Sequence, residues 1–241
     1  MSYLQSDYNF LWAKDGQIGV DIALAQLPDI IISDVMMPNK NGFELCNELK
    51  SNEISAHIYI ILLTVKASTR SQIEGYQFGA DYYMTKPFNP QLLKLQLINI
   101  IKQKKDLAYS LSQMTVQQAQ ERQEETAGLS EIDKAFLVRV EQVILDNLSN
   151  SKFSVLDLNK QLGYSKSQLY RKLKSLINLS PNEFIRRIRL ETAAEMISNS
   201  FYTISEITYQ VGFNDLQYFR SCFKKQYGVT PSTYKSKRKS K

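Results

Sequence analysis

The sequence is poor in the residues that build metal centres and disulfide frameworks. Its 241 residues include one histidine, His57, and two cysteines, Cys46 and Cys222. A single histidine excludes a metal centre built on several histidines. The two cysteines lie far apart, each within a helical apolar pattern, which predicts buried free thiols rather than a disulfide or a metal site.

Long apolar runs are also absent. No stretch approaches the roughly 18 consecutive apolar residues that a membrane span needs, and no secretory leader is recognisable. The 43% hydrophobic content is enough for two modest cores in a chain of 241 residues. We therefore expect a cytoplasmic protein of two domains that makes no membrane contact.

Charge divides the chain into two parts. Residues 130–241 contain 19 lysines and arginines against 10 acidic residues, whereas residues 1–129 contain 11 against 14. An acidic region is thus followed by a basic one, which favours nucleic acid as a partner of the second. Charge alone leaves open a basic surface that serves only solubility.

The last ninety or so residues carry one pattern twice. Residues 153–163 (FSVLDLNKQLG) align with residues 202–212 (YTISEITYQVG) at an offset of 49, and a glycine ends each. After one extra residue the alignment continues at an offset of 50. Each copy has the pattern of a short helix, a glycine turn and a second helix, which is typical of a helix-turn-helix. The pattern predicts an all-α domain that reads double-stranded DNA twice.

The second helix of each copy separates apolar from polar side chains. Leu169, Leu173 and Leu176 recur at spacings of four and three and should face inward, as should Phe219 and Phe223. A helix in the major groove needs basic and hydrogen-bonding groups on its outer face. The predicted DNA-binding residues are Lys166, Ser167, Tyr170, Arg171, Lys174, Asn214, Gln217, Arg220, Ser221 and Lys224.

The region from about Glu131 to Lys235 resembles the DNA-binding domain of the AraC/XylS family of bacterial transcription activators. The motifs that carry the resemblance are Ser180-Pro181-Asn182-Glu183-Phe184, Ile204-Ser205-Glu206-Ile207, Val211-Gly212-Phe213, Phe223-Lys224-Lys225 and Thr230-Pro231-Ser232. Within this region, a serine cap and proline at the first helical position predict a connecting helix that begins at Pro181.

Two positions depart from the family pattern. Asn178 stands where the second copy has Gly228, and asparagine tolerates the left-handed conformation, so we expect the turn to be kept. Ser221 occupies the place of an arginine that the family commonly has in the second copy. Arg220 comes one residue earlier, about 100° round the helix, so Arg171 is the stronger candidate for a DNA contact.

The first hundred residues alternate apolar β runs with helical stretches, which predicts an α/β fold with a parallel sheet. Residues 29–35, 59–64 and 81–87 have the pattern of strands. Asp34, Thr64 and Lys86 stand at their carboxyl ends, where open α/β sheets place their sites. A nucleophilic carboxylate, a hydroxyl and an ammonium together suit acceptance of a phosphoryl group. These three residues alone would fit simple loop capping equally well.

Residues from about Tyr8 to Lys105 resemble the receiver domain of two-component response regulators. The resemblance is carried by Ser33-Asp34-Val35-Met36-Met37-Pro38, Asn41-Gly42, Leu62-Leu63-Thr64, Gly79-Ala80-Asp81 and Thr85-Lys86-Pro87-Phe88. It implies that Asp34 is the phosphoacceptor and a Mg²⁺ ligand, and that Thr64, Tyr83 and Lys86 are the phosphoryl-binding or switch residues. It also implies a cis peptide between Lys86 and Pro87.

The receiver pattern is incomplete at its start. Receivers begin with a strand ending in an acidic pair that binds Mg²⁺, and only residues 1–7 precede the segment that resembles the second strand. The expected fold is a flavodoxin-like receiver whose 2-1-3-4-5 sheet lacks strand 1. The missing pair argues against Mg²⁺-dependent phosphorylation of the chain as given. The chain is then a fragment of a longer protein or a degenerate receiver.

These features predict a truncated receiver over residues 1–105, a partly helical linker over 106–130 and a DNA-binding domain with a basic tail over 131–241. The order resembles the C-terminal end of hybrid two-component regulators. We expect a homodimeric transcription regulator, with an activator as the family precedent, whose DNA binding depends on phosphorylation of Asp34.

The expected partners are double-stranded DNA, a histidine kinase or phosphotransfer domain and RNA polymerase. Two alternatives remain. One is a phosphorylation-independent DNA binder whose receiver serves dimerisation or interaction. The other is a phosphoryl-handling enzyme, against which the missing acidic pair argues, so we expect no enzyme activity.

Overall fold

The computed structural model describes residues 8–65, 77–113, 128–199 and 201–239. The chain forms two compact units. The first contains the described residues up to Phe136 together with Tyr170–Asn178, and the second contains Leu137–Leu169 and the described residues from Leu179 onward.

The first unit is built on a parallel sheet in the order β1-β2-β3. Its strands are β1 (Ile30–Asp34), β2 (Tyr59–Thr64) and β3 (Tyr82–Thr85). Ile31 pairs with Ile60 across the first ladder, and Leu62 pairs with Tyr83 across the second. The three predicted strands and their parallel arrangement are confirmed.

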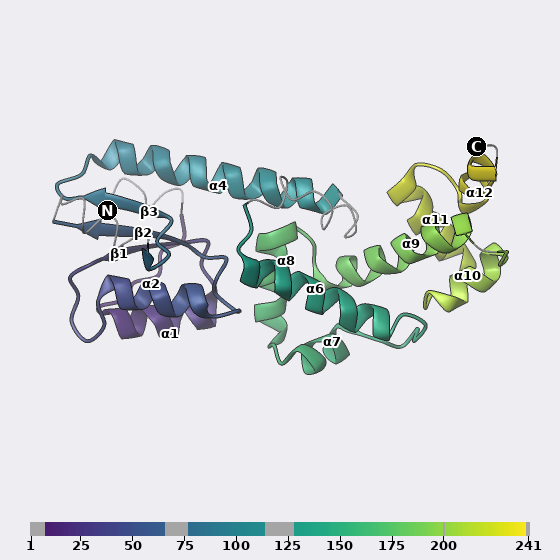
Figure 1. The fold of residues 1–241 in the computed structure, drawn as a ribbon, viewed down its shortest axis with the longest axis horizontal. Helices are drawn as coiled ribbons and strands as arrows, with labels where there is room; N and C mark the ends of the chain where they lie inside the picture. Colours follow the sequence, from purple (N-terminus) through teal and green to yellow (C-terminus); the bar gives the residue numbers. More distant parts are fainter. Residues whose placement is uncertain (1–7, 66–76, 114–127, 200, 240–241) are drawn as a thin grey trace. The chain divides into compact units, whose positions relative to one another are not determined.

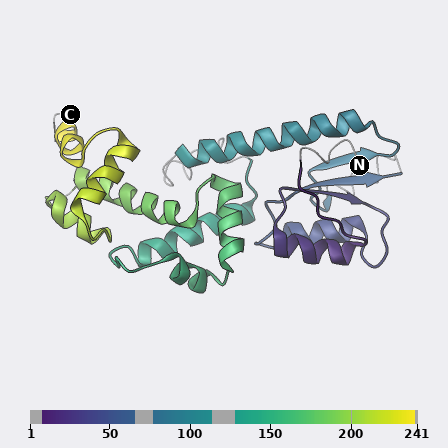
Figure 2. The same ribbon diagram turned by 180° about the vertical axis from the view of Figure 1, so that it is seen from behind.

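Helices cover both faces of this sheet (Figures 1 and 2). On one face, α1 (Gly16–Gln26) and α2 (Gly42–Ser51) pack on Ile60 and Leu62. On the other, α4 (Pro90–Gln113) packs on Ile61 through Leu93, Leu97 and Ile100. The buried stripe of α4 continues through Ile100 and leaves Ile98 44% exposed.

Local sequence fixes where these helices begin. Asp15 caps α1 by accepting the Ile18 N–H at 2.9 Å, and Asn41 opens α2 with a capping box that includes Glu44. The first eight residues of the predicted linker continue α4 as far as Gln113. The rest of the linker up to residue 127 lies outside the described residues.

Residues 8–15, at the start of the segment that resembles the second receiver strand, form no strand. A strand forms only by hydrogen bonding to a neighbour, and among the described residues the sheet contains β1, β2 and β3 alone. Tyr8 packs against the α4 side of the sheet, whereas Trp12 is 74% exposed. Residues 1–7 lie outside the described residues.

The described residues from 128 onward form helices joined by short turns. The helices are α6 (Glu131–Asp146), α7 (Val155–Leu162), α8 (Lys166–Ile177), α9 (Pro181–Asn199), α10 (Ile204–Gln210), α11 (Leu216–Tyr227) and α12 (Pro231–Lys239). The connecting helix begins at Pro181 as predicted. Cys46 is buried and Cys222 is partly buried, and both are free thiols.

The duplication is visible in how the helices begin and end. Capping boxes at Ser154 and Thr203 open α7 and α10, 49 residues apart. Gly163 and Gly212 follow with φ of 76° and 79°, where residues with a Cβ are strained. At Gly212 an added Cβ would also lie 2.3 Å from the carbonyl oxygen of Leu148. Backbone conformation thus favours glycine at both turns, and close packing adds to this preference at Gly212.

The duplicated unit includes a third helix that the sequence comparison did not identify. Ser130 and Ser180 stand 50 residues apart, directly before α6 and α9. The hydroxyl oxygen of Ser130 accepts the N–H of Asp133 at 3.1 Å, and that of Ser180 accepts the N–H of Glu183 at 3.3 Å. Each unit thus consists of a long helix followed by the two helices of a helix-turn-helix.

Candidate DNA-binding surface and phosphoacceptor site

The outer face of α8 presents most of the residues predicted to contact DNA. Lys166, Ser167, Tyr170 and Arg171 are exposed, while Leu169, Leu173 and Leu176 are buried. The predicted division of this helix into two faces is therefore present. Lys174 is only half-buried, and its Nζ donates to the carbonyl oxygen of Asn178 at 2.8 Å. Its ammonium closes the end of its own helix.

The outer face of α11 is equally polar. The predicted contact residues Asn214, Gln217, Arg220, Ser221 and Lys224 are all exposed. Phe219 and Phe223 are buried among the aromatic side chains of the same unit. In both helices, hydrogen-bonding and cationic groups thus project from a rigid apolar base, as readout of base edges and phosphates requires.

Two residues near these faces were missed from the sequence. Tyr218 is 54% exposed on α11, and Arg186 donates to its hydroxyl at 3.5 Å. Lys172 is fully buried on the inner face of α8 and pairs with Asp133. Lys172 follows Leu169 by three residues, so its place on the apolar stripe was readable in the sequence. Its partner was not, because Asp133 lies 39 residues earlier.

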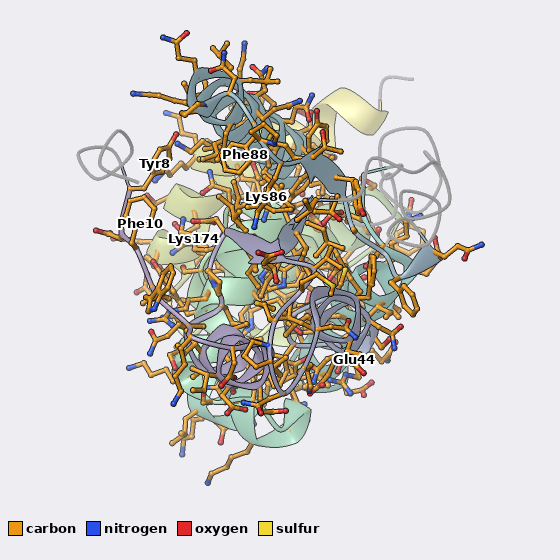
Figure 3. The ribbon with its side chains drawn as sticks, turned by 90° about the vertical axis from the view of Figure 1, so that its left-hand side faces the viewer. Tyr8, Phe10, Glu44, Lys86, Phe88 and Lys174 are labelled. Carbon is orange, nitrogen blue, oxygen red and sulfur yellow. The ribbon has the colours of Figure 1, made fainter. Side chains whose placement is uncertain are left out.

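At the carboxyl end of the sheet, Asp34 and Lys86 form an ion pair. Asp34 ends β1, and its carboxylate also accepts the N–H of Met36 at 3.1 Å. Figure 3 views this end of the sheet, with Lys86 between the side of α4, marked by Phe88, and that of α2, marked by Glu44. Each of the paired side chains is one-third exposed, which leaves the pair accessible to a small donor.

Thr64 and Tyr83 are less accessible. Thr64 ends β2 and is 3% exposed, and its carbonyl oxygen accepts the N–H of Lys86 at 2.6 Å. Tyr83 is 9% exposed, and its buried hydroxyl has no hydrogen-bond partner among the described residues. The sheet brings Asp34 and Lys86 into direct contact, whereas Tyr83 lies in the core. The peptide between Lys86 and Pro87 is cis, as predicted.

Asp34 is the residue expected to bind Mg²⁺. This cation takes oxygen ligands in an octahedral arrangement, in proteins mostly from carboxylates and water. Across the described ranges there is no group of three or more histidine, cysteine, aspartate or glutamate side chains that could hold a metal ion. Lys86 instead supplies the positive charge next to Asp34.

Two family models match the two halves of the sequence. The response regulator receiver domain matches residues 2–98, and the helix-turn-helix domain matches residues 158–237. The chain joins a response regulator receiver domain to an AraC-type helix-turn-helix domain. The expected resemblances are confirmed in this order. Within the described residues, no helix has the length and apolar character of a membrane span.

Three curated relatives are similar to this chain over different shares of its length. Histidine kinase P4 of Formosa agariphila is 38% identical over 97% of this chain and 17% of its own length. The probable transcriptional regulator ycf29 of Pyropia yezoensis is 30% identical over 64% of this chain and 66% of its own length. The phosphate regulon transcriptional regulatory protein PhoB of Pseudomonas aeruginosa is 37% identical over 39% of this chain and 42% of its own length. The chain thus spans less than two thirds of each relative.

Solved structures similar to this chain include both kinds of domain. The C-terminal domain of AraT, a response regulator from Geobacillus stearothermophilus, is 32% identical over 46% of this chain and 88% of its own, with a TM-score of 0.40. A receiver domain of a histidine kinase from Syntrophus aciditrophicus is 30% identical over 42% of this chain and 76% of its own, with a TM-score of 0.39.

Proposed function

We propose that this receiver–regulator chain is a sequence-specific DNA-binding transcription regulator of a two-component phosphorelay. The observation that carries the proposal is the repeated helix-turn-helix, in which α8 and α11 each present exposed polar and basic residues from a buried apolar face. Each monomer would place two recognition helices in successive major grooves, about 34 Å apart. Double-stranded DNA is the partner, and the protein has no enzymatic step of its own.

Binding to DNA is tested by fluorescence anisotropy with labelled duplexes. The full chain should bind a duplex enriched from a random pool more tightly than a random duplex of the same length. Affinity for both should fall as salt rises, because cationic side chains displace counterions from phosphates. Equal affinity for enriched and random duplexes would reduce the chain to a nonspecific binder.

Phosphorylation of Asp34 is the proposed control. A carboxylate oxygen of Asp34 would attack the phosphorus of a phosphohistidine on a kinase or phosphotransfer domain, and the histidine would leave. Lys86, already paired with Asp34, would neutralise part of the charge that the phosphoryl group brings. Thr64 and Tyr83 would form the switch. A homodimer and contact with RNA polymerase complete the proposed regulatory assembly.

Phosphorylation of Asp34 is tested by incubating the chain with acetyl phosphate and measuring the intact mass of the protein. Transfer of one phosphoryl group to the chain releases acetate, and Asp34→Ala should abolish the added mass. Labelling is run with and without Mg²⁺, since receivers typically require it and the described ranges contain no cluster of three or more metal-binding side chains. Circular dichroism confirms that the variant is folded.

A phosphorylation-independent DNA binder is the second candidate. It is favoured by the absence, in the described ranges, of a cluster of metal-binding side chains. In that case Asp34→Ala leaves DNA affinity unchanged, and the receiver serves dimerisation or interaction.

A further inference from the structure

The inner face of α8 contains one charged residue among leucines. Lys172 lies on the same stripe as Leu169, Leu173 and Leu176, and its side chain has no exposed surface. Lysine is rarely buried without a partner, because removing an ammonium from water is costly. Burial accordingly lowers the pKa of Lys172, and the nearby Asp133 carboxylate opposes that shift.

The first turn of α6 supplies the carboxylate that pairs with Lys172, whose Nζ also donates to the carbonyl oxygen of Glu53. Its Nζ donates to Oδ1 of Asp133 at 2.6 Å, and it lies 4.8 Å from the centroid of the Phe136 ring. The other carboxylate oxygen, Oδ2, accepts the Ser130 hydroxyl at 2.7 Å. The Asp133 side chain is 3% exposed. Ser130 thus holds the carboxylate in place while the carboxylate holds Lys172.

Such a pair restrains α8 in a way that leucines cannot. Apolar contacts are non-directional, so a leucine stripe tolerates small rotations and shifts of the helix. A buried ammonium that loses its carboxylate remains uncompensated, which is strongly unfavourable. Successive residues are about 100° apart round the helix, so the orientation of Lys172 also fixes that of Tyr170 and Arg171 on the outer face.

We propose that Lys172 and Asp133 are positioning residues that set which side chains of α8 face DNA. The inference rests on the proposed function of α8 as a DNA reader. The second repeat provides an internal comparison, because the position equivalent to Lys172 is Cys222 and that equivalent to Asp133 is Glu183. This ion pair therefore belongs to the first repeat, and its loss should affect one half-site only.

The test is selection of duplexes from a random pool by the full chain, with sequencing of the enriched pool. Arg171→Ala identifies the half-site that α8 reads. Lys172→Met and Asp133→Asn should each reduce base preference in that half-site by about tenfold and leave the other half-site unchanged. Lys160→Met is the matched control, because Lys160 is an exposed lysine on α7 outside the predicted contact set. It should retain both half-sites.

The double variant Lys172→Met with Asp133→Leu separates positioning from stability. Replacing both partners by apolar groups removes the uncompensated charge, so this variant should fold even if a single variant does not. The proposal predicts that the folded double variant still loses preference in the first half-site. Full wild-type preference in the double variant would overturn it. Failure of the wild type to enrich any duplex would instead refute the proposed function.

Discussion

Asn178 and Gly228 end α8 and α11 in the same left-handed conformation, with φ of 53° and 74°. The two residues stand 50 positions apart, at equivalent places in the repeat. Asparagine adopts this conformation at a modest cost, and glycine adopts it freely. The turn expected from the sequence is therefore kept in both copies, with different residues.

Substitutions at Asn178 should follow this conformational preference. Asn178→Gly should change the free energy of unfolding by less than about 1 kcal/mol, whereas Asn178→Val should lower it by about 1–2 kcal/mol, because a β-branched side chain is strained at positive φ. Urea unfolding followed by circular dichroism measures both. Equal stability of the valine and glycine variants would show that the backbone there is not constrained.

The two helix caps offer a matched pair of substitutions. Ser154 and Thr203 each accept the backbone N–H three residues later, from Asp157 and Glu206 respectively. Ser154→Ala and Thr203→Ala should each lower the free energy of unfolding by about 1 kcal/mol, since a backbone donor loses its partner. Chemical denaturation of the two variants checks this. Ser110→Ala, on the exposed surface of α4, serves as the control and should show no loss.

Glu141 should make stability depend on pH. Burial and the neighbouring Glu191 carboxylate raise the pKa of Glu141 from 4.5 to about 7, against the opposing effect of Arg187. Between these pH values the unfolded chain has already released the proton that the folded protein retains. The contribution of Glu141 to the free energy of unfolding therefore falls as pH rises from 4.5 to about 7.

Glu141→Gln removes this titration. The variant should be more stable than the wild type at pH 8, by about 1–2 kcal/mol because solvent screens part of the effect, and the difference should shrink toward pH 5. Thermal or urea unfolding at both pH values measures the effect. Glu131→Gln, at a largely exposed carboxylate, is the control and should show no such pH-dependent gain. A constant difference between Glu141→Gln and the wild type would contradict the assignment.

Two substitutions that each remove one positive charge should distinguish a residue that reads bases from one that only attracts phosphates. Arg171→Ala should cost about 1–3 kcal/mol on an enriched duplex and less on random DNA, because a base contact is lost. Lys225→Ala should weaken both duplexes by similar amounts and reduce the salt dependence. Anisotropy titrations at two salt concentrations decide between these patterns. Equal losses on both duplexes for Arg171→Ala would remove it from the base readers.

Local patterns in the sequence predicted much of the fold. The three strands follow from apolar runs, and the start of α9 follows from Ser180 before Pro181. The inner face of α8 follows from leucines at helical spacing. Each of these signals depends on residues within a few positions of one another, which is the range over which sequence determines local structure.

The failures concern features that depend on distant partners. Residues 8–14 have the composition of a strand, but a strand also needs a neighbour to pair with. Lysine is usually found at the surface, yet Lys172 is buried, and the Asp133 carboxylate compensates its charge. Neither the lack of a strand partner nor the burial of Lys172 can be predicted from neighbouring residues in the sequence.

The spacing of half-sites in duplexes selected by the wild-type chain tests the central claim most directly. Two recognition helices in successive major grooves predict two conserved half-sites about 10 base pairs apart, with one lost in Arg171→Ala. A pool with one half-site, or with no enriched sequence, would contradict a regulator that reads DNA with both copies of its repeat.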